Sequence, residues 1–287
     1  MDLTSAMDGI AKLSEQAIPL EEGDYIGEDG LYYCHNCNTP KQVKVENPFV
    51  AGQFDIRSCL CKCRVAKRNA EDAERQRIAF EREVKELRRR GFPESNMQDW
   101  TFENNDGEGD QKIMTAAKAY VENFKKMLTD GKGLLLFGNV GSGKTYAAAC
   151  IVNALIDKGY PCVMTNFSRI ANTAQGLFDG RQEYFDSFNR FPLIVLDDFK
   201  AERSTDFMNE IIHSIIDSRY RAGLPLIITT NLTNDELKHP ADITNQRTFS
   251  RLLEMCIPIE VTGKDRRRSI LKETFDEYSE ILGLKGE

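Results

Sequence analysis

The sequence predicts an α/β domain, a parallel sheet flanked by helices, preceded by a small cysteine-rich module and a charged helix. Three observations carry this prediction. Short apolar runs alternate with amphipathic helical segments from about residue 100 onward, the glycine-rich loop "GNVGSGKT" directly follows one of these runs, and five of the eight cysteines fall between residues 34 and 63. Alternating strands and helices are typical of a parallel sheet with helices on both faces.

The composition is that of a soluble protein with a sizeable core. The chain has 287 residues, of which 41% are hydrophobic and 29% charged. Its longest apolar runs are far short of the ~20 residues that cross a bilayer, and its start lacks the pattern of a secretory signal. We therefore expect a cytoplasmic protein with no membrane partner. The net charge of −7 argues against a general nucleic-acid coat protein.

Composition divides the chain into four parts. These are an acidic leader (1–30), a zinc-binding module (31–63), a charged linker helix (64–93) and a nucleotide-binding domain (94–287). Residues 64–90 contain no proline or glycine and are rich in Ala, Glu, Arg and Lys, which favours one long helix. Gly91 and Pro93 are expected to end it.

The last part alternates strands and helices in order. We expect strands at 132–138, 160–166, 192–198 and 224–231. Helices are expected at 111–128, 143–159, 168–188 with a break at Gly180, and 205–223.

The loop at 138–145 fits the phosphate-binding pattern G-x-x-x-x-G-K-[ST]. Its expected ATP-binding residues are Gly138, Asn139, Val140, Gly141, Ser142, Gly143, Lys144 and Thr145, followed by Tyr146. Glycines let the backbone turn successive N–H groups towards phosphate oxygens, and the helix that begins here adds its partial positive charge. We expect Lys144 to reach the β- and γ-phosphates and the Thr145 hydroxyl to ligate Mg²⁺.

Two acidic residues end the apolar run "LIVL". Open α/β sheets bind ligands at the carboxyl ends of their strands, so we expect Asp197 to hold Mg²⁺ and Asp198 to polarise the water that attacks the γ-phosphate. The alternative is an ordinary strand that ends in an acidic turn. Asn231 ends the next apolar run, where it could orient that water or touch the γ-phosphate; alternatively, it caps the following helix.

The cysteine cluster predicts a zinc site. Its candidate ligands are Cys34, Cys37, Cys59, Cys61 and Cys63, of which four would bind and Cys59 is the least favoured. Close thiolate pairs separated by a short excursion suit tetrahedral Zn²⁺, and the metal would supply much of the folding energy of so small a module. His35 is a weak substitute ligand. A redox pair at Cys34 and Cys37, or reactive free thiols, are the alternatives.

The phosphate loop, the Asp–Asp strand end and the strand-terminal Asn together resemble the AAA+ ATPases. The resemblance extends to "FSRL" and "GKDRRRS". It implies that Arg251, or less favourably Arg247, projects into the ATP site of a neighbouring subunit. It also implies a short C-terminal helical lid with a sensor arginine at Arg266 or Arg267. A surface salt bridge is the alternative role for Arg251.

The full layout, including "TFEN" at 101–104, resembles the DnaC/DnaI-type replicative helicase loaders. That resemblance implies an ATPase, slow unless assembled or stimulated by single-stranded DNA, that loads a hexameric replicative helicase during replication initiation. The N-terminal region would contact the helicase, and the AAA+ core would bind ATP and DNA. AAA+ cores would also associate with one another or dock on other AAA+ domains. Arg169, Phe167 and Arg181 are candidates for the DNA surface, with ordinary helix surface as the alternative.

Three other functions stay open at this point. An IstB-type ATPase that assists DNA transposition shares the core, although a cysteine-rich module is less expected there. A non-hydrolysing adaptor would use ATP only to assemble, which the Asp197–Asp198 pair argues against. An enzyme acting on a small molecule would show no dependence on DNA or helicase.

Overall fold

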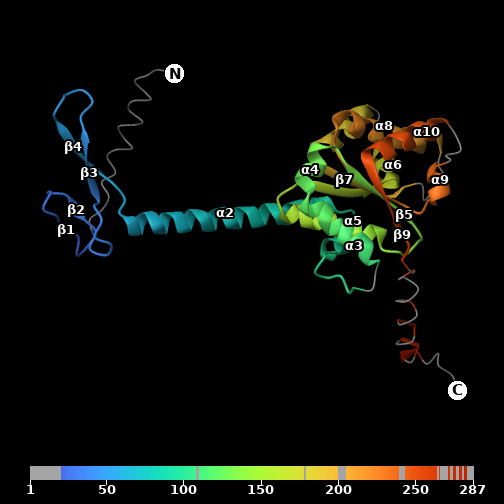
Figure 1. The fold of residues 1–287 in the computed structure, drawn as a ribbon, viewed down its shortest axis with the longest axis horizontal. Helices are drawn as coiled ribbons and strands as arrows, with labels where there is room; N and C mark the ends of the chain where they lie inside the picture. Colours follow the sequence, from blue (N-terminus) through green and yellow to red (C-terminus); the bar gives the residue numbers. More distant parts are fainter. Residues whose placement is uncertain are drawn as a thin grey trace. The chain divides into compact units, whose positions relative to one another are not determined.

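The chain forms two compact units. The computed structural model describes residues 21–107, 110–177, 179–199, 205–238 and 243–263, with isolated positions up to 282. The boundary between the units falls between Phe80 and Glu81, inside helix α2 (Lys62–Gly91). This helix contains the whole charged stretch 64–90 but begins two residues before the expected linker helix and ends at Gly91 (Figure 1).

The first unit contains two small antiparallel ribbons. Strand β1 (Tyr25–Ile26) pairs with β2 (Tyr32–Tyr33), and β3 (Gln42–Glu46) pairs with β4 (Phe54–Ser58). The pairing of β1 with β2 ties residues of the acidic leader to the start of the cysteine-rich segment. This unit therefore includes residues on both sides of position 30.

Within the described part of the first unit, very few residues are buried. Among its described residues, only Leu31, Cys34, Lys41 and Cys61 are less than 9% exposed. Lys41 is held by an ion pair with Asp24, whose side chain is 2% exposed. Since two of the four buried residues are cysteines, the cysteine cluster lies at the centre of this unit.

The second unit is built on a five-stranded parallel sheet, which confirms the predicted fold class. Its strands are β5 (Gly133–Gly138), β6 (Cys162–Asn166), β7 (Leu193–Phe199), β8 (Leu226–Thr230) and β9 (Cys256–Val261), in the order β6-β7-β8-β5-β9. Four of these match the expected strands. Strand β9 was not predicted: it lies at the sheet edge, where Pro258 is tolerated because one side of the strand needs no partner.

Helices cover both faces of this sheet (Figure 1). In chain order they are η1 (Ser95–Asp99), α3 (Gln111–Glu122), α4 (Phe124–Thr129), α5 (Lys144–Asp157), α6 (Phe167–Gln175), α7 (Arg181–Asp186), η2 (Ser187–Arg190), α8 (Asp206–Ala222), α9 (Asn234–Lys238) and α10 (Ile243–Met255). Apolar residues of α3 and α5 pack with Leu134 and Leu136 on one face. Those of α6, α8 and α10 pack with Leu135 and Phe137 on the other. The alternation along β5 thus supplies both halves of the core.

Two helical predictions need correction. The expected helix at 111–128 is divided into α3 and α4 at Asn123, whose side-chain amide donates to the Ala119 carbonyl at 2.8 Å. The segment at 168–188 forms three short helices, with a break after Gln175 as well as at Gly180. The predicted lid falls largely outside the described residues, as do Arg266 and Arg267.

No helix within the described ranges combines the length and the apolar character needed to cross a bilayer.

Candidate nucleotide site and cysteine cluster

The sheet topology brings the predicted nucleotide-binding segments to one edge. Strands β7, β8 and β5 are neighbours and run parallel, so their carboxyl ends lie side by side. Asp197 and Asp198 come from β7, Asn231 follows β8, and the phosphate loop follows β5. This is the edge at which open α/β sheets bind ligands.

The phosphate loop adopts a backbone that requires glycine. Gly138, Gly141 and Gly143 have φ angles of 127°, 74° and 98°, in the left-handed region that side chains disfavour. A Cβ at Gly138 would meet the Val261 carbonyl of the adjacent strand, and one at Gly141 would meet the Asp265 carboxylate. The loop is thus held in shape by its neighbours as well as by its own sequence.

Lys144 begins α5 and turns back over the loop. Its ammonium group donates to the Gly138 carbonyl at 2.9 Å and the Asn139 carbonyl at 2.6 Å, and the residue is 6% exposed. The Ser142 hydroxyl donates to the same Asn139 carbonyl at 2.7 Å. The positive charge is therefore fixed at the N-terminus of a helix, where backbone N–H groups also favour an anion.

The two residues expected to hold Mg²⁺, Thr145 and Asp197, contact each other. The Thr145 hydroxyl donates to Asp197 Oδ1 at 3.0 Å. Asp197 is 9% exposed, and this burial raises the pKa of its carboxyl from its ordinary value. Hydroxyl and carboxylate oxygens are the hard ligands that Mg²⁺ prefers, and it is bound through few protein ligands plus phosphates, so the two residues fit this ion.

A cavity of about 330 Å³ opens beside these groups. It is lined by Val140, Gly141, Ser142, Gly143, Lys144, Thr145, Tyr146, Asp198 and Asn231, together with Trp100, Asn104 and Asp106. The cavity thus brings the phosphate loop together with one carboxylate and one amide from neighbouring strand ends.

Sequence reasoning missed the wall formed by Trp100, Asn104 and Asp106. The Trp100 ring lies 5.7 Å from the Tyr146 ring, and the Tyr146 hydroxyl donates to the Thr101 carbonyl at 3.0 Å. These contacts hold the segment before α3 against the first turn of α5. The available signal was the only tryptophan in the chain, next to the "TFEN" stretch.

Asn231 is exposed and lines the cavity, and another residue caps the helix that follows it. The Thr233 hydroxyl accepts from the Glu236 N–H, while the Glu236 carboxylate accepts from the Thr233 N–H. This reciprocal pair is a capping box. The structure therefore gives the N-cap role to Thr233 and leaves Asn231 at the cavity.

Arg251 is not among the described residues that line the cavity of its own chain. It lies on α10, forms an ion pair with Asp217 of α8, and places its guanidinium 5.6 Å from the Tyr220 ring centre. The salt bridge weighed as an alternative is thus present within one chain. Arg247 lies on the same helix and is exposed.

One DNA-surface candidate is corrected by the structure. Phe167 is 4% exposed and packs in the core, with its ring 5.6 Å from that of Phe199, so it cannot stack on a base. Arg169 is exposed and donates to the Pro93 carbonyl at 2.7 Å. Arg181 is exposed, and its Nε donates to the Ala174 carbonyl at 3.0 Å.

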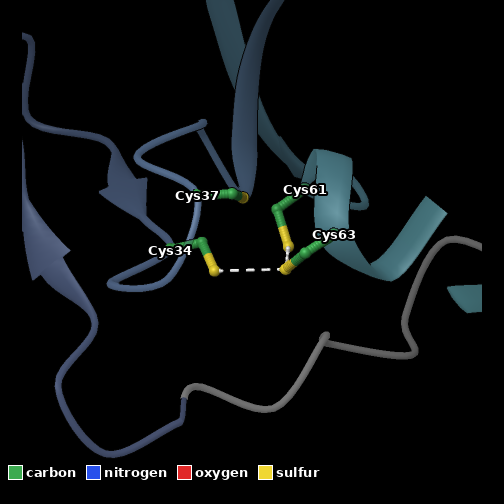
Figure 2. Close-up of side chains that lie close together, drawn as sticks. All are labelled: Cys34, Cys37, Cys61 and Cys63. Carbon is green, nitrogen blue, oxygen red and sulfur yellow. Dashed lines mark hydrogen bonds between the residues drawn. The ribbon is translucent and has the colours of Figure 1, made fainter. Parts of the chain in front are cut away.

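In the first unit, four cysteines converge (Figure 2). The sulfur atoms of Cys34, Cys37, Cys61 and Cys63 all lie within 4.8 Å of one another. Cys63 Sγ is 3.6 Å from Cys34 Sγ and 3.3 Å from Cys61 Sγ. Zinc–sulfur bonds of about 2.3 Å in a tetrahedron put sulfurs roughly 3.8 Å apart, so the cluster fits one zinc ion.

The surroundings of the cluster agree with this donor set. The Thr39 hydroxyl lies 3.0 Å from Cys37 Sγ, and this hydrogen bond is the largest of the contacts that lower the pKa of the Cys37 thiol to about 6. Hydrogen bonds with the Cys61 and Cys34 sulfurs instead raise the pKa of the Cys63 thiol to about 12. The fifth candidate, Cys59, lies apart, with its sulfur 3.5 Å from the Pro40 carbonyl. The His35 ring contacts Asp24 at 3.3 Å.

A phosphate loop on a parallel sheet, with a threonine–aspartate pair beside it, defines a P-loop NTPase. The family described as Novel STAND NTPase 3 matches residues 116–277, so the chain belongs to that family of NTPases. The fold is similar to that of a solved protein: a crystal structure of DnaI matches with a TM-score of 0.51 and 23% identity, covering 62% of this chain and 96% of that one.

Curated relatives include replicative helicase loaders, which confirms the resemblance inferred from the motifs. DnaI of Bacillus subtilis is 28% identical over 169 residues, 55% of this chain and 53% of that protein. DnaC of Buchnera aphidicola subsp. Schizaphis graminum is 23% identical over 159 residues, 53% of this chain and 62% of that protein. A Mycobacterium tuberculosis protein described as ATP-binding in an insertion sequence is 28% identical over 108 residues, 37% and 43% of the two chains. The chain spans about half the length of the curated relatives it matches.

Proposed function

We propose that this chain is an ATP-dependent loader of a hexameric replicative DNA helicase onto single-stranded DNA. The observation that supports the proposal is the geometry of the phosphate loop, where Lys144 is held over the loop and Thr145 contacts Asp197, in a domain whose relatives include DnaI and DnaC. The reaction is hydrolysis of ATP to ADP and phosphate. Its use is to switch the loader between holding and releasing the helicase.

We assign roles in that reaction to five residues that line the cavity and to Asp197, which contacts one of them. Lys144 binds the β- and γ-phosphates. Thr145 and Asp197 would hold Mg²⁺, which would supply positive charge beside the phosphates. Asp198 and Asn231 line the same cavity, where they polarise and orient the attacking water. Trp100 supplies an aromatic surface at the same cavity, suited to the base.

Arg251 acts between subunits in this proposal. In one chain it is bound to Asp217, and its side chain keeps 32% exposure, so association of two ATPase domains can redirect it. A guanidinium delivered to the neighbour's γ-phosphate stabilises the charge that develops there. Arg266, in the segment after β9, is proposed as the sensor arginine of the same chain. Hydrolysis is then slow until the domains assemble.

The first unit is proposed to bind the helicase. Its β3–β4 hairpin carries exposed apolar side chains: Phe49, Phe54 and Ile56 are 88%, 59% and 54% exposed. Exposed apolar groups gathered on one element mark protein-binding surfaces. The cysteine cluster, with zinc, fixes the base of this hairpin.

A second candidate is assistance to DNA transposition. The relative described as ATP-binding in an insertion sequence favours it, because the same ATPase core serves there. A transposase, rather than a helicase, would then stimulate ATP hydrolysis.

The loading reaction itself tests the proposal. Helicase is added to circular single-stranded DNA annealed to a labelled oligonucleotide and coated with single-strand-binding protein, and strand displacement is followed with and without this chain. We expect displacement to require the chain, and Lys144→Ala to abolish it. Equal displacement without the chain, or stimulation only by a transposase, would overturn the proposal.

A further inference from the structure

Strand β7 is irregular where it delivers its two carboxylates. Leu196 pairs with Ile228, and Phe199 pairs with Thr230. Two residues of β7, Asp197 and Asp198, therefore stand opposite the single residue Thr229 of β8. This is the arrangement of a β-bulge, which re-aims side chains at the end of a strand.

The bulge changes where the two acids point. In a regular strand, successive side chains face opposite sides of the sheet, so only one of two adjacent acids could serve one site. Asp198 instead has a φ of 54°, in the left-handed region that few residues with side chains adopt. Asp197 contacts Thr145 while Asp198 lines the nucleotide cavity, so both carboxylates serve the same site.

One hydroxyl holds both residues of the bulge. Thr229 is fully buried, and its Oγ1 donates to Asp197 Oδ1 and accepts the backbone N–H of Asp198 at 3.0 Å. The first bond orients the carboxylate assigned to Mg²⁺. The second fixes the peptide that turns Asp198 towards the cavity.

We propose that Thr229 is a positioning residue that aims Asp197 and Asp198 together at the Mg²⁺–ATP end of the cavity. The inference rests on the proposed ATPase function but not on a helicase partner. Some residues do not touch the metal but donate a hydrogen bond to a carboxylate that binds it. Mutation of such a residue typically lowers metal affinity or activity by 10- to 100-fold.

The test compares Thr229→Val with Thr229→Ser. Valine matches threonine in shape and suits a strand but lacks the hydroxyl, whereas serine retains it. A fluorescent ATP analogue is titrated into the full chain with Mg²⁺ and with EDTA, and ATP turnover is measured at saturating Mg²⁺–ATP. Thermal unfolding shows that each variant is folded.

We expect Thr229→Val to reduce the Mg²⁺-dependent gain in affinity, and the turnover at saturation, by about 10- to 100-fold. The affinity of Thr229→Val for the analogue in EDTA should stay unchanged. Thr229→Ser should retain most of the Mg²⁺-dependent gain in affinity and most of the turnover. A purely structural role would instead lower affinity in both conditions. Equal behaviour of Thr229→Val and the parent chain, or a parent affinity that Mg²⁺ does not change, would overturn the inference.

A double variant tests whether Thr229 acts through Asp198 in turnover. If it does, Thr229→Val should lower the turnover of the Asp198→Asn variant much less than it lowers the turnover of the parent chain. The reason is that the effects of coupled residues are not additive. Full additivity would contradict this coupling. Since these measurements use no helicase, failure of the loader proposal would leave their outcome intact.

Discussion

Removal of zinc should unfold the first unit and leave the ATPase unit folded. The perturbation is Cys61→Ser, or treatment of the parent chain with a strong chelator. Cys61 is 1% exposed and its sulfur lies 3.3 Å from that of Cys63, at the centre of the cluster. The matched control is Cys59→Ser, because the Cys59 sulfur lies outside the four-cysteine cluster.

The expected loss of stability is large because the described residues of the first unit bury few side chains apart from the cysteines. Among its described residues, Leu31 is the one buried apolar side chain that is not a cysteine, and burial of a leucine contributes about 1.5–3 kcal/mol. Structural zinc in small domains contributes an apparent 10–16 kcal/mol near pH 7. Loss of the metal therefore removes several times the folding free energy that the buried leucine contributes. The ATPase unit has a large core on both sheet faces and needs no such support.

Three measurements check this prediction. Metal analysis should find about one zinc per chain in the parent and in Cys59→Ser, and much less in Cys61→Ser. Limited proteolysis should then cleave Cys61→Ser rapidly between residues 21 and 61 while sparing the ATPase unit. ATP-analogue affinity, which depends on that unit, should be unchanged. A metal-free chain whose first unit resists proteolysis as the parent does would refute the reasoning.

The remaining predictions concern the nucleotide site. Lys144→Ala should weaken ATP binding by at least about 100-fold, because it removes a charge-assisted contact to the phosphates, and unchanged affinity in the analogue titration would contradict the site. Trp100→Ala should weaken ATP-analogue binding by about 10-fold through loss of roughly 1–2 kcal/mol of aromatic contact, without lowering turnover at saturation; equal affinity would exclude Trp100 from base binding. Arg251→Ala should spare ATP binding but remove stimulated hydrolysis, whereas the control Arg247→Ala should spare both; normal stimulation of Arg251→Ala would contradict its role between subunits.

The fold was predictable where local signals agree with the tertiary structure. Strands β5, β6, β7 and β8 are apolar runs in the sequence. The phosphate-loop motif also predicts a strand before it and a helix after it. Strand β9 was missed because its middle residues are exposed or half-buried and include a proline, so its pattern is not that of a buried strand. The other edge strand, β6, is more deeply buried and was predicted. The break between α3 and α4 at Asn123 was not predicted, because the helical spacing of apolar residues continues through that position.

The candidate site could be predicted where a sequence motif fixes the spacing of its residues. Lys144, Thr145 and Asp197 lie together as their types and spacing indicate. Trp100 and Thr229 could not be found this way, because an aromatic residue and a strand threonine are common structural choices. Their significance comes from contacts with residues 46 and 32 positions away in the sequence, Tyr146 and Asp197, which only the folded chain reveals.

The central claim is tested most directly by complex formation with the helicase. The purified full chain is mixed with the hexameric replicative helicase of its own cell, with and without ATP, and analysed by size exclusion with light scattering. The account predicts a stable complex that depends on the first unit, is lost in Cys61→Ser, and changes its stability with ATP. Absence of any complex, with ATP hydrolysis stimulated by a transposase instead, would contradict it.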